Sequence, residues 1–497
     1  MIERTLPASS HAKPFSRILK FGGTSVATAP RRAAVAEIVR RAHRRGPVVV
    51  VTSALAGVTD LLQQALSRAV AGELPAAFLD DLRRRHLQDA GGSPAMVEAR
   101  RRFAQTLAGL EKLLTGVALL GECPAAARHR CLAAGERLAL PLVVAALEDA
   151  GLRATGADGA ALLVAACREP DGEPEIDLDA SRARTLAARR RLEQDEVAVV
   201  TGFVAGDGRG GTVTLGRGAS DLSATLLAAF LDAEAVEIWS DVDGLLSGPP
   251  RHLPEASPLA AMSYGEAAAM ALYGARVLHP EALAPVAAAG IPVWIRNTLT
   301  PESPGTRIDG GPDEETMWTA PAAVTMVPAS RLRLRGPWHR RDLPSRVLAV
   351  LERRGVRPLL VDPGVPGGIL EVVVAATAAA TVEDALRDEL AGGDVFVDRQ
   401  DVAVVAAVGR GSGTAGETLR TLQDQGIRTL AVSGSAGTTV AVVGGADGPR
   451  AVACLHEALA AGRTLLPHES LTPLAPLSHP LPFPRERGEP DPRIAHP

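Results

Sequence analysis

The sequence PVVVVT at residues 47–52 constrains the fold of this chain more than any other segment. A short run of β-branched apolar residues is typical of a buried strand. A second strand is expected at residues 18–21, and each strand leads through a loop into a helix, at 33–42 and from residue 61 onward. This order of strands and helices predicts a parallel α/β sheet whose strands are connected by crossover helices.

The sheet is expected to continue farther along the chain. Residues 70–150 have Leu, Ala and Arg at helical spacing, and strands are expected at 196–204, 235–239 and 292–296. A Gly-rich turn at 206–211, followed by a return strand at 212–215, predicts a hairpin. Helices are expected at 222–231 and 264–278.

The last third of the chain contains an internal repeat. Two units follow the order βαββαβ, the first from residue 332 to 398 and the second from residue 402 to 460. This order is ferredoxin-like, and the repeat has a period of roughly 70 residues. From about residue 467 the chain is rich in Pro and has few large apolar groups, so we expect disorder there.

The composition excludes several functional classes. The formal net charge is −4 and aromatic residues make up 3%, which argues against a nucleic-acid binder. No stretch of about 18 uninterrupted apolar residues occurs, so no membrane span is expected. The four cysteines form no C-x-x-C pair and no metal-ligand spacing, which predicts no protein-bound metal and fits a reduced, cytoplasmic compartment.

A candidate phosphate loop follows the first strand. Lys20 precedes Gly22 and Gly23, whose backbone N–H groups can approach a phosphate while the lysine supplies a charge. The alternative is an ordinary turn in which glycine provides a positive φ. Only three of the 53 basic residues are lysines, namely Lys13, Lys20 and Lys112. In a chain where almost every cation is arginine, a lysine at this position favours the phosphate-loop interpretation.

Two further polar segments are candidates for a site. The segment GRGASD at 216–221 opens a helix, where Arg217 can grip a carboxylate and Asp221 can orient a lysine; alternatively, Ser220 or Asp221 only caps the helix. The segment SDVDG at 240–244 follows a strand of an α/β sheet, where ligands gather. Its acids, Asp241 and Asp243, could hold Mg²⁺ or nucleotide, or could only form a polar turn.

Other motifs favour a structural role. Arg276, in the last turn of a helix, could meet a phosphate or only compensate the helix dipole. His279, directly before a proline, is more typical of a structural residue. The segment GSGTAG at 411–416 matches the glycine pattern of dinucleotide sites, but the following strand ends without the acid that such sites require. We therefore do not expect a dinucleotide there.

Taken together in order, six segments resemble the motifs of the aspartokinase family. They are KFGGTSV at 20–26, SALAGVT at 53–59, GER at 135–137, LGRGASD at 215–221, IWSDVDG at 238–244 and GARVLHP at 274–280. The segment ACLH at 453–456 is also similar to the end of the last helix of the family's ACT domains. The resemblance spans about residues 17–460, which is nearly the whole chain.

The resemblance implies an α/β fold. The amino-acid-kinase domain is a three-layer sandwich with a mainly parallel sheet, and two ferredoxin-like βαββαβ ACT units follow it. The expected segments are a disordered N-terminal extension at 1–16, a catalytic domain at 17–310, a linker at 311–328, ACT units at 329–399 and 400–465, and a disordered tail at 466–497. Relatives fused to homoserine dehydrogenase exist, and the Pro-rich tail leads us to expect that activity to be absent here.

The resemblance also implies phosphoryl transfer from MgATP to the β-carboxylate of L-aspartate, the first step of lysine, threonine and methionine biosynthesis. Lys20 would stabilise the transferring group and Asp221 would organise that lysine. The implied substrate-binding residues are Thr59, Glu136 for the ammonium, Arg217 for the α-carboxylate, and Ser220. The implied nucleotide-binding residues are Lys20, Gly22, Gly23, Ser240, Asp241, Arg251 and Arg276. An amino-acid effector at the ACT units and a homo-oligomer of two or more subunits are also expected.

The sequence departs from the family at several positions. Arg276 stands where lysine is usual, Leu246 replaces a common tyrosine, and Pro249 replaces the aspartate of an Asp-Pro-Arg motif. In the first ACT unit the expected Ser/Thr-rich effector segment reads VDPGVPG at 361–367, and its prolines lack backbone donors. Two alternatives to an aspartate kinase therefore stay open. One is another carboxylate kinase of the amino-acid-kinase family, and the other is a catalytically weak amino-acid sensor.

Overall fold

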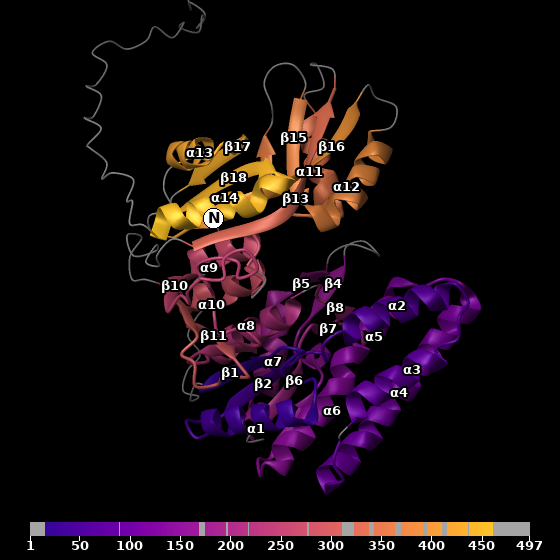
Figure 1. The fold of residues 1–497 in the computed structure, drawn as a ribbon. Helices are drawn as coiled ribbons and strands as arrows, with labels where there is room; N and C mark the ends of the chain where they lie inside the picture. The colour runs from indigo at the N-terminus through magenta and orange to yellow at the C-terminus, as the bar shows by residue number, and fades with distance from the viewer. Residues whose placement is uncertain are drawn as a thin grey trace, which may run out of the picture.

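A computed structural model provides the structure of the chain. It describes residues 15–88, 90–167, 174–194, 197–216, 218–275, 278–310, 323–336, 342–362, 369–390, 395–409, 415–435 and 437–460. Figure 1 shows the indigo and magenta elements of the first 310 residues in the lower part of the molecule and the orange and yellow elements above them.

The first part is built on an eight-stranded sheet in the order β10-β12-β11-β9-β1-β2-β6-β3. Its strands are β1 (Arg17–Phe21), β2 (Val48–Thr52), β3 (Ala154–Ala157), β6 (Val197–Thr201), β9 (Val236–Ser240), β10 (Ala261–Ser263), β11 (Val293–Asn297) and β12 (Thr306–Asp309). Every pair is parallel except β11 with β12. The valine run forms β2, which is buried along its whole length between β1 and β6. The predicted parallel α/β sheet is confirmed.

Helices cover both faces of this sheet. One layer consists of α1 (Ala29–His43), α2 (Val58–Val70), α3 (Ala76–Leu87), α4 (Pro94–Leu120), α5 (Ala125–Leu132) and α6 (Ala134–Asp149). The opposite face carries α7 (Leu178–Gln194), α8 (Ala219–Leu231), α9 (Tyr264–Leu272), the 3₁₀ turn η2 (Pro280–Leu283) and α10 (Ala284–Ala289). Alternation along β1 divides the two cores: Leu19 and Phe21 pack with the first layer, and Ile18 packs with the second. This is the expected three-layer sandwich.

Smaller elements complete the first part: η1 (Gly159–Ala161), the pair β4 (Ala165–Cys167) and β5 (Pro174–Ile176), and the hairpin of β7 (Val204–Gly206) and β8 (Thr212–Thr214). The predicted hairpin is confirmed, but the predicted strand at 196–204 is wrong in one respect. It breaks at Gly202 and Phe203, because Phe203 has φ of 66°. The helix predicted at 264–278 ends at Leu272.

Helix α4 is long and apolar enough to cross a membrane, the only such helix among the described residues. It begins at Pro94 behind the N-cap Ser93 and ends at Gly121, whose φ of 69° is the left-handed conformation that glycine adopts readily. Its residues Phe103, Leu107 and Leu114 are buried in the core that α2 and α6 share. Only this face of α4 is buried, because Val97, Leu119 and Leu120 are exposed.

The second part is one six-stranded sheet in the order β14-β15-β13-β16-β18-β17. Its elements are β13 (Ala323–Arg335), α11 (Leu343–Arg353), β14 (Leu360–Asp362), β15 (Ile369–Ala375), α12 (Ala376–Glu389), β16 (Phe396–Val408), α13 (Ala415–Asp424), β17 (Thr429–Ser435), β18 (Thr438–Gly444), η4 (Gly445–Asp447) and α14 (Gly448–Ala460). The two predicted βαββαβ units are present, joined within this sheet.

The boundaries expected between these units need correction. Strand β13 begins at Ala323, inside the expected linker at 311–328, and pairs with β16 along its whole length. Strand β16 in turn crosses the expected boundary at residue 400. The first part of β16 belongs to the first unit. The second part of β16, together with the start of β13, belongs to the second unit. The first unit is therefore inserted into the second.

Two other expectations concern the ends of the chain. Phe15 and Ser16, expected in a disordered extension, belong to the folded domain: Phe15 is fully buried, and the Ser16 backbone N–H donates to the Pro47 carbonyl. The tail at 466–497, the glycine-rich residues 411–414 and the effector segment from residue 363 lie outside the described residues.

Candidate functional site

A cavity of about 570 Å³ opens at the carboxyl ends of β1, β2 and β6. Strand β1 lies where the sheet order reverses, with β2 and β6 on one side and β9 and β11 on the other, and ligands of α/β sheets bind at such points. The residues lining the cavity that the sequence analysis had predicted are Lys20, Gly22, Gly23, Thr59, Glu136 and Ser220.

Lys20 and Asp221 form an ion pair in this cavity. Lys20 is the last residue but one of β1, and Asp221 lies in the first turn of α8. The distance from Lys20 Nζ to Asp221 Oδ1 is 2.6 Å. Both side chains are largely buried, with 13% and 7% of their surface exposed. Because charged pairs are stronger where water is excluded, Asp221 holds the lysine ammonium in one orientation at the cavity wall.

Glu136 is the most unusual group in the cavity. It lies in the first turn of α6 with 3% of its surface exposed, and its Oε1 accepts a hydrogen bond from the Ala54 N–H at 3.1 Å. Its Oε2 is buried without a hydrogen-bond partner among the described residues. Burial is the main cause that raises the pKa of Glu136 to about 8. A buried carboxylate oxygen without a partner is costly unless a ligand supplies a donor or a cation.

Two helices begin at the cavity without side-chain caps. The N-caps are Gly57 for α2 and Gly218 for α8, and neither helix has a side-chain hydrogen bond at its N-cap. The alternative that Ser220 or Asp221 only caps α8 is therefore wrong. The second residue of each helix, Thr59 in α2 and Ser220 in α8, lines the cavity. Exposed N–H groups at helix N-termini attract anions, so this wall suits a carboxylate or a phosphate.

The two glycines of the phosphate loop differ in the space that a side chain would have. Neither Gly22 nor Gly23 has a positive φ, so the ordinary-turn alternative does not explain them. A Cβ on Gly23 would lie 2.5 Å from the Ala54 carbonyl oxygen, because the phosphate loop packs directly against residues 53–57. The N–H of Gly22 donates to the Trp239 carbonyl at 3.0 Å, which leaves Gly23 as the better candidate for a backbone contact to phosphate.

We predict that Gly23→Ala destabilises the protein by about 1–3 kcal/mol, the usual cost of overpacking a close contact. The added methyl group would push the phosphate loop away from residues 53–57, so ADP binding should also weaken. Thermal unfolding and calorimetry with ADP measure both effects. Gly22→Ala is the matched control, since its nearest neighbour would be the Trp239 carbonyl oxygen at 3.6 Å. Equal losses of stability in the two variants would contradict the prediction.

Two of the predicted nucleotide-binding residues, Ser240 and Asp241, lie on the other side of β1. Ser240 ends β9 and Asp241 follows it, and β9 pairs in parallel with β1. Neither residue lines the 570 Å³ cavity. Asp243 serves the loop itself, because it accepts hydrogen bonds from Thr300 Oγ1 at 2.6 Å and Asn297 Nδ2 at 2.8 Å. These bonds, in that order of strength, hold the pKa of Asp243 below its usual value.

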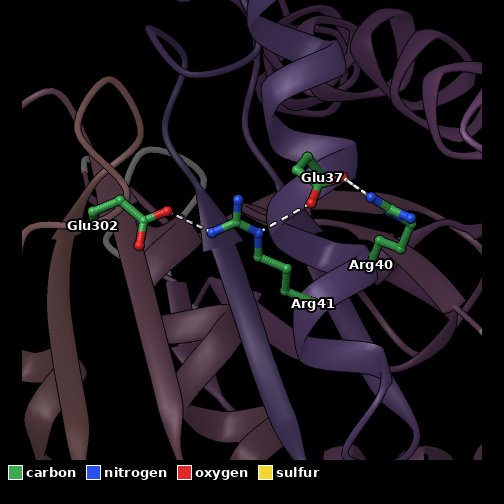
Figure 2. A network of polar contacts seen from close by, with 4 residues as sticks. All are labelled: Glu37, Arg40, Arg41 and Glu302. Carbon is green, nitrogen blue, oxygen red and sulfur yellow. Dashed lines mark hydrogen bonds and ion pairs between the residues drawn. The ribbon is translucent and has the colours of Figure 1, made fainter.

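The segment after β11, residues 298–305, connects this region to the rest of the domain. Thr298 contacts Ser25 of the phosphate loop, with 2.7 Å between the two hydroxyl oxygens. At its other end Glu302 accepts a hydrogen bond from Arg41 Nη1 at 2.6 Å, and Arg41 also pairs with Glu37 on α1 (Figure 2). The ion pairs of Arg41 are exposed, so we assign them a local ordering role and little stability.

Of the three predicted arginines, the structure describes only Arg251. Arg251 is exposed on the loop between β9 and β10 and does not line the cavity. Arg217 and Arg276 lie outside the described residues. The roles predicted for these three residues stay predictions.

The sequence analysis missed several residues of the cavity wall, including His129 and Phe203. His129 on α5 lies beside Thr214 of β8, and its Nδ1 accepts a hydrogen bond from the Thr214 N–H at 3.2 Å. Phe203 lines the cavity with a strained positive φ, stabilised by a hydrogen bond from its N–H to Ser223 Oγ. The only local signal was the Gly202-Phe203 step in an otherwise apolar strand pattern.

A larger cavity, of about 960 Å³, lies between α8, α10 and the end of α11. Of the predicted catalytic and binding residues that the structure describes, none lines it, although His279 does. Volume alone therefore does not identify the functional site, whereas the smaller cavity contains the convergent charged groups.

Comparisons with known proteins agree with this geometry. A family model described as the amino acid kinase family matches residues 16–297. Lysine-sensitive aspartokinase 3 of Escherichia coli is 29% identical over 463 residues, which cover 89% of this chain and 98% of that protein. The bifunctional aspartokinase/homoserine dehydrogenase of Haemophilus influenzae is 29% identical over 470 residues, but the chain covers only 56% of its length.

Among solved structures, that of E. coli aspartokinase III in complex with aspartate and ADP superposes with a TM-score of 0.76. The two sequences are 26% identical, and the superposition covers 89% of this chain and 99% of that one. The similarity therefore includes both the catalytic part and the six-stranded sheet.

Proposed function

Because the chain belongs to the amino acid kinase family, we propose that it is an aspartate kinase, which transfers the γ-phosphoryl group of MgATP to the β-carboxylate of L-aspartate. The observation that carries this proposal is the unpartnered buried oxygen of Glu136 in the same cavity as Lys20 and the open N-terminus of α8. An amino acid with a second carboxylate has one group for each of these features: an ammonium for Glu136, one carboxylate for the N-terminus of α8 and the other for Lys20.

In the proposed complex, Glu136 Oε2 accepts the ammonium of aspartate. Arg217 grips the α-carboxylate, while Thr59 and Ser220 contribute hydroxyl groups from the two helix N-termini. The β-carboxylate then faces Lys20. In this placement the ammonium supplies the positive charge that a buried carboxylate requires.

The reaction needs little from the protein beyond this positioning. An oxygen of the ionised β-carboxylate attacks the γ-phosphorus, the bond from phosphorus to the bridging oxygen of ADP breaks, and an acyl phosphate forms. No proton must be removed from the acceptor, so no general base is required. Lys20, held by Asp221, stabilises the negative charge on the transferring group, and the Mg²⁺ that accompanies ATP neutralises the phosphates. Ser240, Asp241, Arg251 and Arg276 would hold the nucleotide.

The test uses the purified chain with MgATP, L-aspartate and hydroxylamine, which traps the acyl phosphate as a hydroxamate. We expect hydroxamate with aspartate and none above background with Lys20→Ala. No hydroxamate in the wild-type reaction would contradict the proposal. Product with glutamate instead of aspartate would favour another carboxylate kinase. Amino-acid binding without ATP binding, measured by calorimetry, would favour a sensor.

We further propose that the protein acts in the cytoplasm, in the biosynthesis of lysine, threonine and methionine, as a feedback-regulated homo-oligomer. Its four cysteines are free, as expected in a reducing compartment. The six-stranded sheet ends in the edge strands β14 and β17, which could pair with a second subunit. A thermal-shift screen with the three amino acids would identify the effector, and light scattering would measure the oligomeric state.

A further inference from the structure

The loop between β9 and β10, residues 241–260, extends from the catalytic domain, and hydrogen bonds connect its two sides. At its base the Leu259 N–H donates to the Leu245 carbonyl at 2.8 Å, and Thr306 of β12 bridges both residues. One step outward the Ser247 N–H donates to the Ser257 carbonyl at 2.8 Å. This β9–β10 loop begins at Asp241, next to the end of β9, and carries Arg251 near its tip.

The tip of the β9–β10 loop is part of the core of the second ACT unit. Leu253 has 2% of its surface exposed and packs with Val405 of β16, Leu422 of α13 and Leu455 of α14. The backbone joins the sheet as well, because the Val324 N–H at the start of β13 donates to the Ser247 carbonyl at 2.9 Å. Figure 1 shows α14 and β13 directly above the elements of the catalytic domain.

A side-chain contact fixes the same point from α14. Ser247 Oγ lies 3.0 Å from His456 Nε2, and it also accepts a hydrogen bond from the Ser257 N–H at 3.0 Å. The neighbouring Gly248 has no space for a side chain, since a Cβ would lie 2.3 Å from Leu253 Cδ1. Arg251 is thus placed between two anchors on the second ACT unit, Ser247 before it and Leu253 after it.

We propose that His456 is a positioning residue for the nucleotide. Through Ser247, α14 fixes the β9–β10 loop, so the position of Arg251 depends on the second ACT unit although the nucleotide binds to the catalytic domain. The inference rests on the proposed function, which assigns Ser240, Asp241 and Arg251 to the nucleotide. It predicts that a change in α14 alters nucleotide binding and leaves aspartate binding unchanged. The 570 Å³ cavity, to which we assign aspartate, lies on the opposite side of β1.

The experiment measures KM for ATP and for aspartate, and ADP binding by calorimetry, in the full-length chain. His456→Ala and Ser247→Ala are each expected to raise KM for ATP and the Kd for ADP about fivefold, the effect of one lost neutral hydrogen bond. KM for aspartate should stay within twofold of wild type. In an Arg251→Ala background, His456→Ala should have no further effect on ADP binding, because both changes act on the same contact.

His456→Gln distinguishes positioning from a general structural role. The glutamine amide can donate to or accept from Ser247 Oγ, so it is expected to restore ADP binding to within twofold of wild type. Glu457→Gln, at an exposed neighbouring position on α14, is the matched control and should leave all constants unchanged. Wild-type ADP affinity in both His456→Ala and Ser247→Ala would overturn the inference, as would equal losses for ATP and aspartate.

The two proposals can fail separately. ADP binding that weakens in the variants, in a protein that does not phosphorylate aspartate, would support the positioning role and contradict the proposed substrate. Hydroxamate formation with unchanged ADP binding in the variants would support the aspartate kinase and overturn the role of His456. A wild-type protein that binds no ADP would overturn both.

Discussion

Lys20→Ala is expected to lower kcat for hydroxamate formation about 10³-fold, the effect of removing one preorganised charge from a phosphoryl-transfer site. The lysine ammonium is held against Asp221 at 2.6 Å with little exposure to water, so no solvent molecule can replace it at equal strength. KM for aspartate should change much less than kcat, because the ammonium acts on charge that develops during transfer.

Lys112→Ala is the matched control for this variant. Lys112 lies exposed on α4, outside the cavity, so kcat should stay at the wild-type value. Lys20→Arg tests whether the position of the charge matters. It keeps the charge in a larger, forked group that cannot occupy the same space beside Gly22. We expect it to remain well below wild type. A fully active Lys20→Arg would show that charge alone matters and that the position of the ammonium does not.

Glu136→Ala is expected to lower kcat/KM for aspartate about 10²- to 10³-fold, in keeping with the roughly 3–5 kcal/mol that removal of one partner from a buried ion pair costs. The loss should appear mainly in KM for aspartate, with KM for ATP nearly unchanged, because Glu136 lies in the acceptor cavity and away from the end of β9. Steady-state kinetics with each substrate varied in turn would measure this difference.

The same residue predicts a pH dependence. Burial raises the pKa of Glu136 to about 8, so below pH 8 the carboxyl group is mostly protonated before aspartate binds. The aspartate ammonium favours the ionised form, so binding must release that proton below the pKa. KM for aspartate is therefore expected to fall as pH rises from 6.5 to 8, by up to about tenfold per pH unit, and to level off above.

Glu136→Gln removes the titrating group while keeping the shape of the side chain. Its KM for aspartate should be high and nearly independent of pH over the same range, whereas KM for ATP provides the internal control in both proteins. Calorimetry in buffers of different ionisation enthalpy would detect the proton released by the wild type. If the glutamine variant kept the wild-type pH dependence, another group would be responsible.

Much of the fold could be predicted because its signals are local. The valine run of β2, for example, depends on a few neighbouring residues and on whether their side chains can be buried. The order of strands and helices then restricts the connections to a parallel sheet. The resemblance to a family added the functional roles, which no single motif of this chain would have supported.

The errors came from segments in which the local pattern is weak. Pro328 and Asp401 interrupt the apolar patterns of β13 and β16, so the sequence predicted a linker and a boundary there. In the structure both lie inside long strands that pair along thirteen positions, and Pro328 lies one residue before β15 begins to pair with β13. Its missing N–H can face the side of β13 where no strand lies.

The sequence by itself determined the parallel sheet, the repeated βαββαβ order and the candidate residues of the site. Only the tertiary structure decided that one oxygen of Glu136 is left without a partner and that Leu253 of the catalytic domain packs inside the second ACT unit. The physical reason is that turns and burial patterns depend on neighbouring residues, whereas these contacts arise when distant segments pack and exclude water between them.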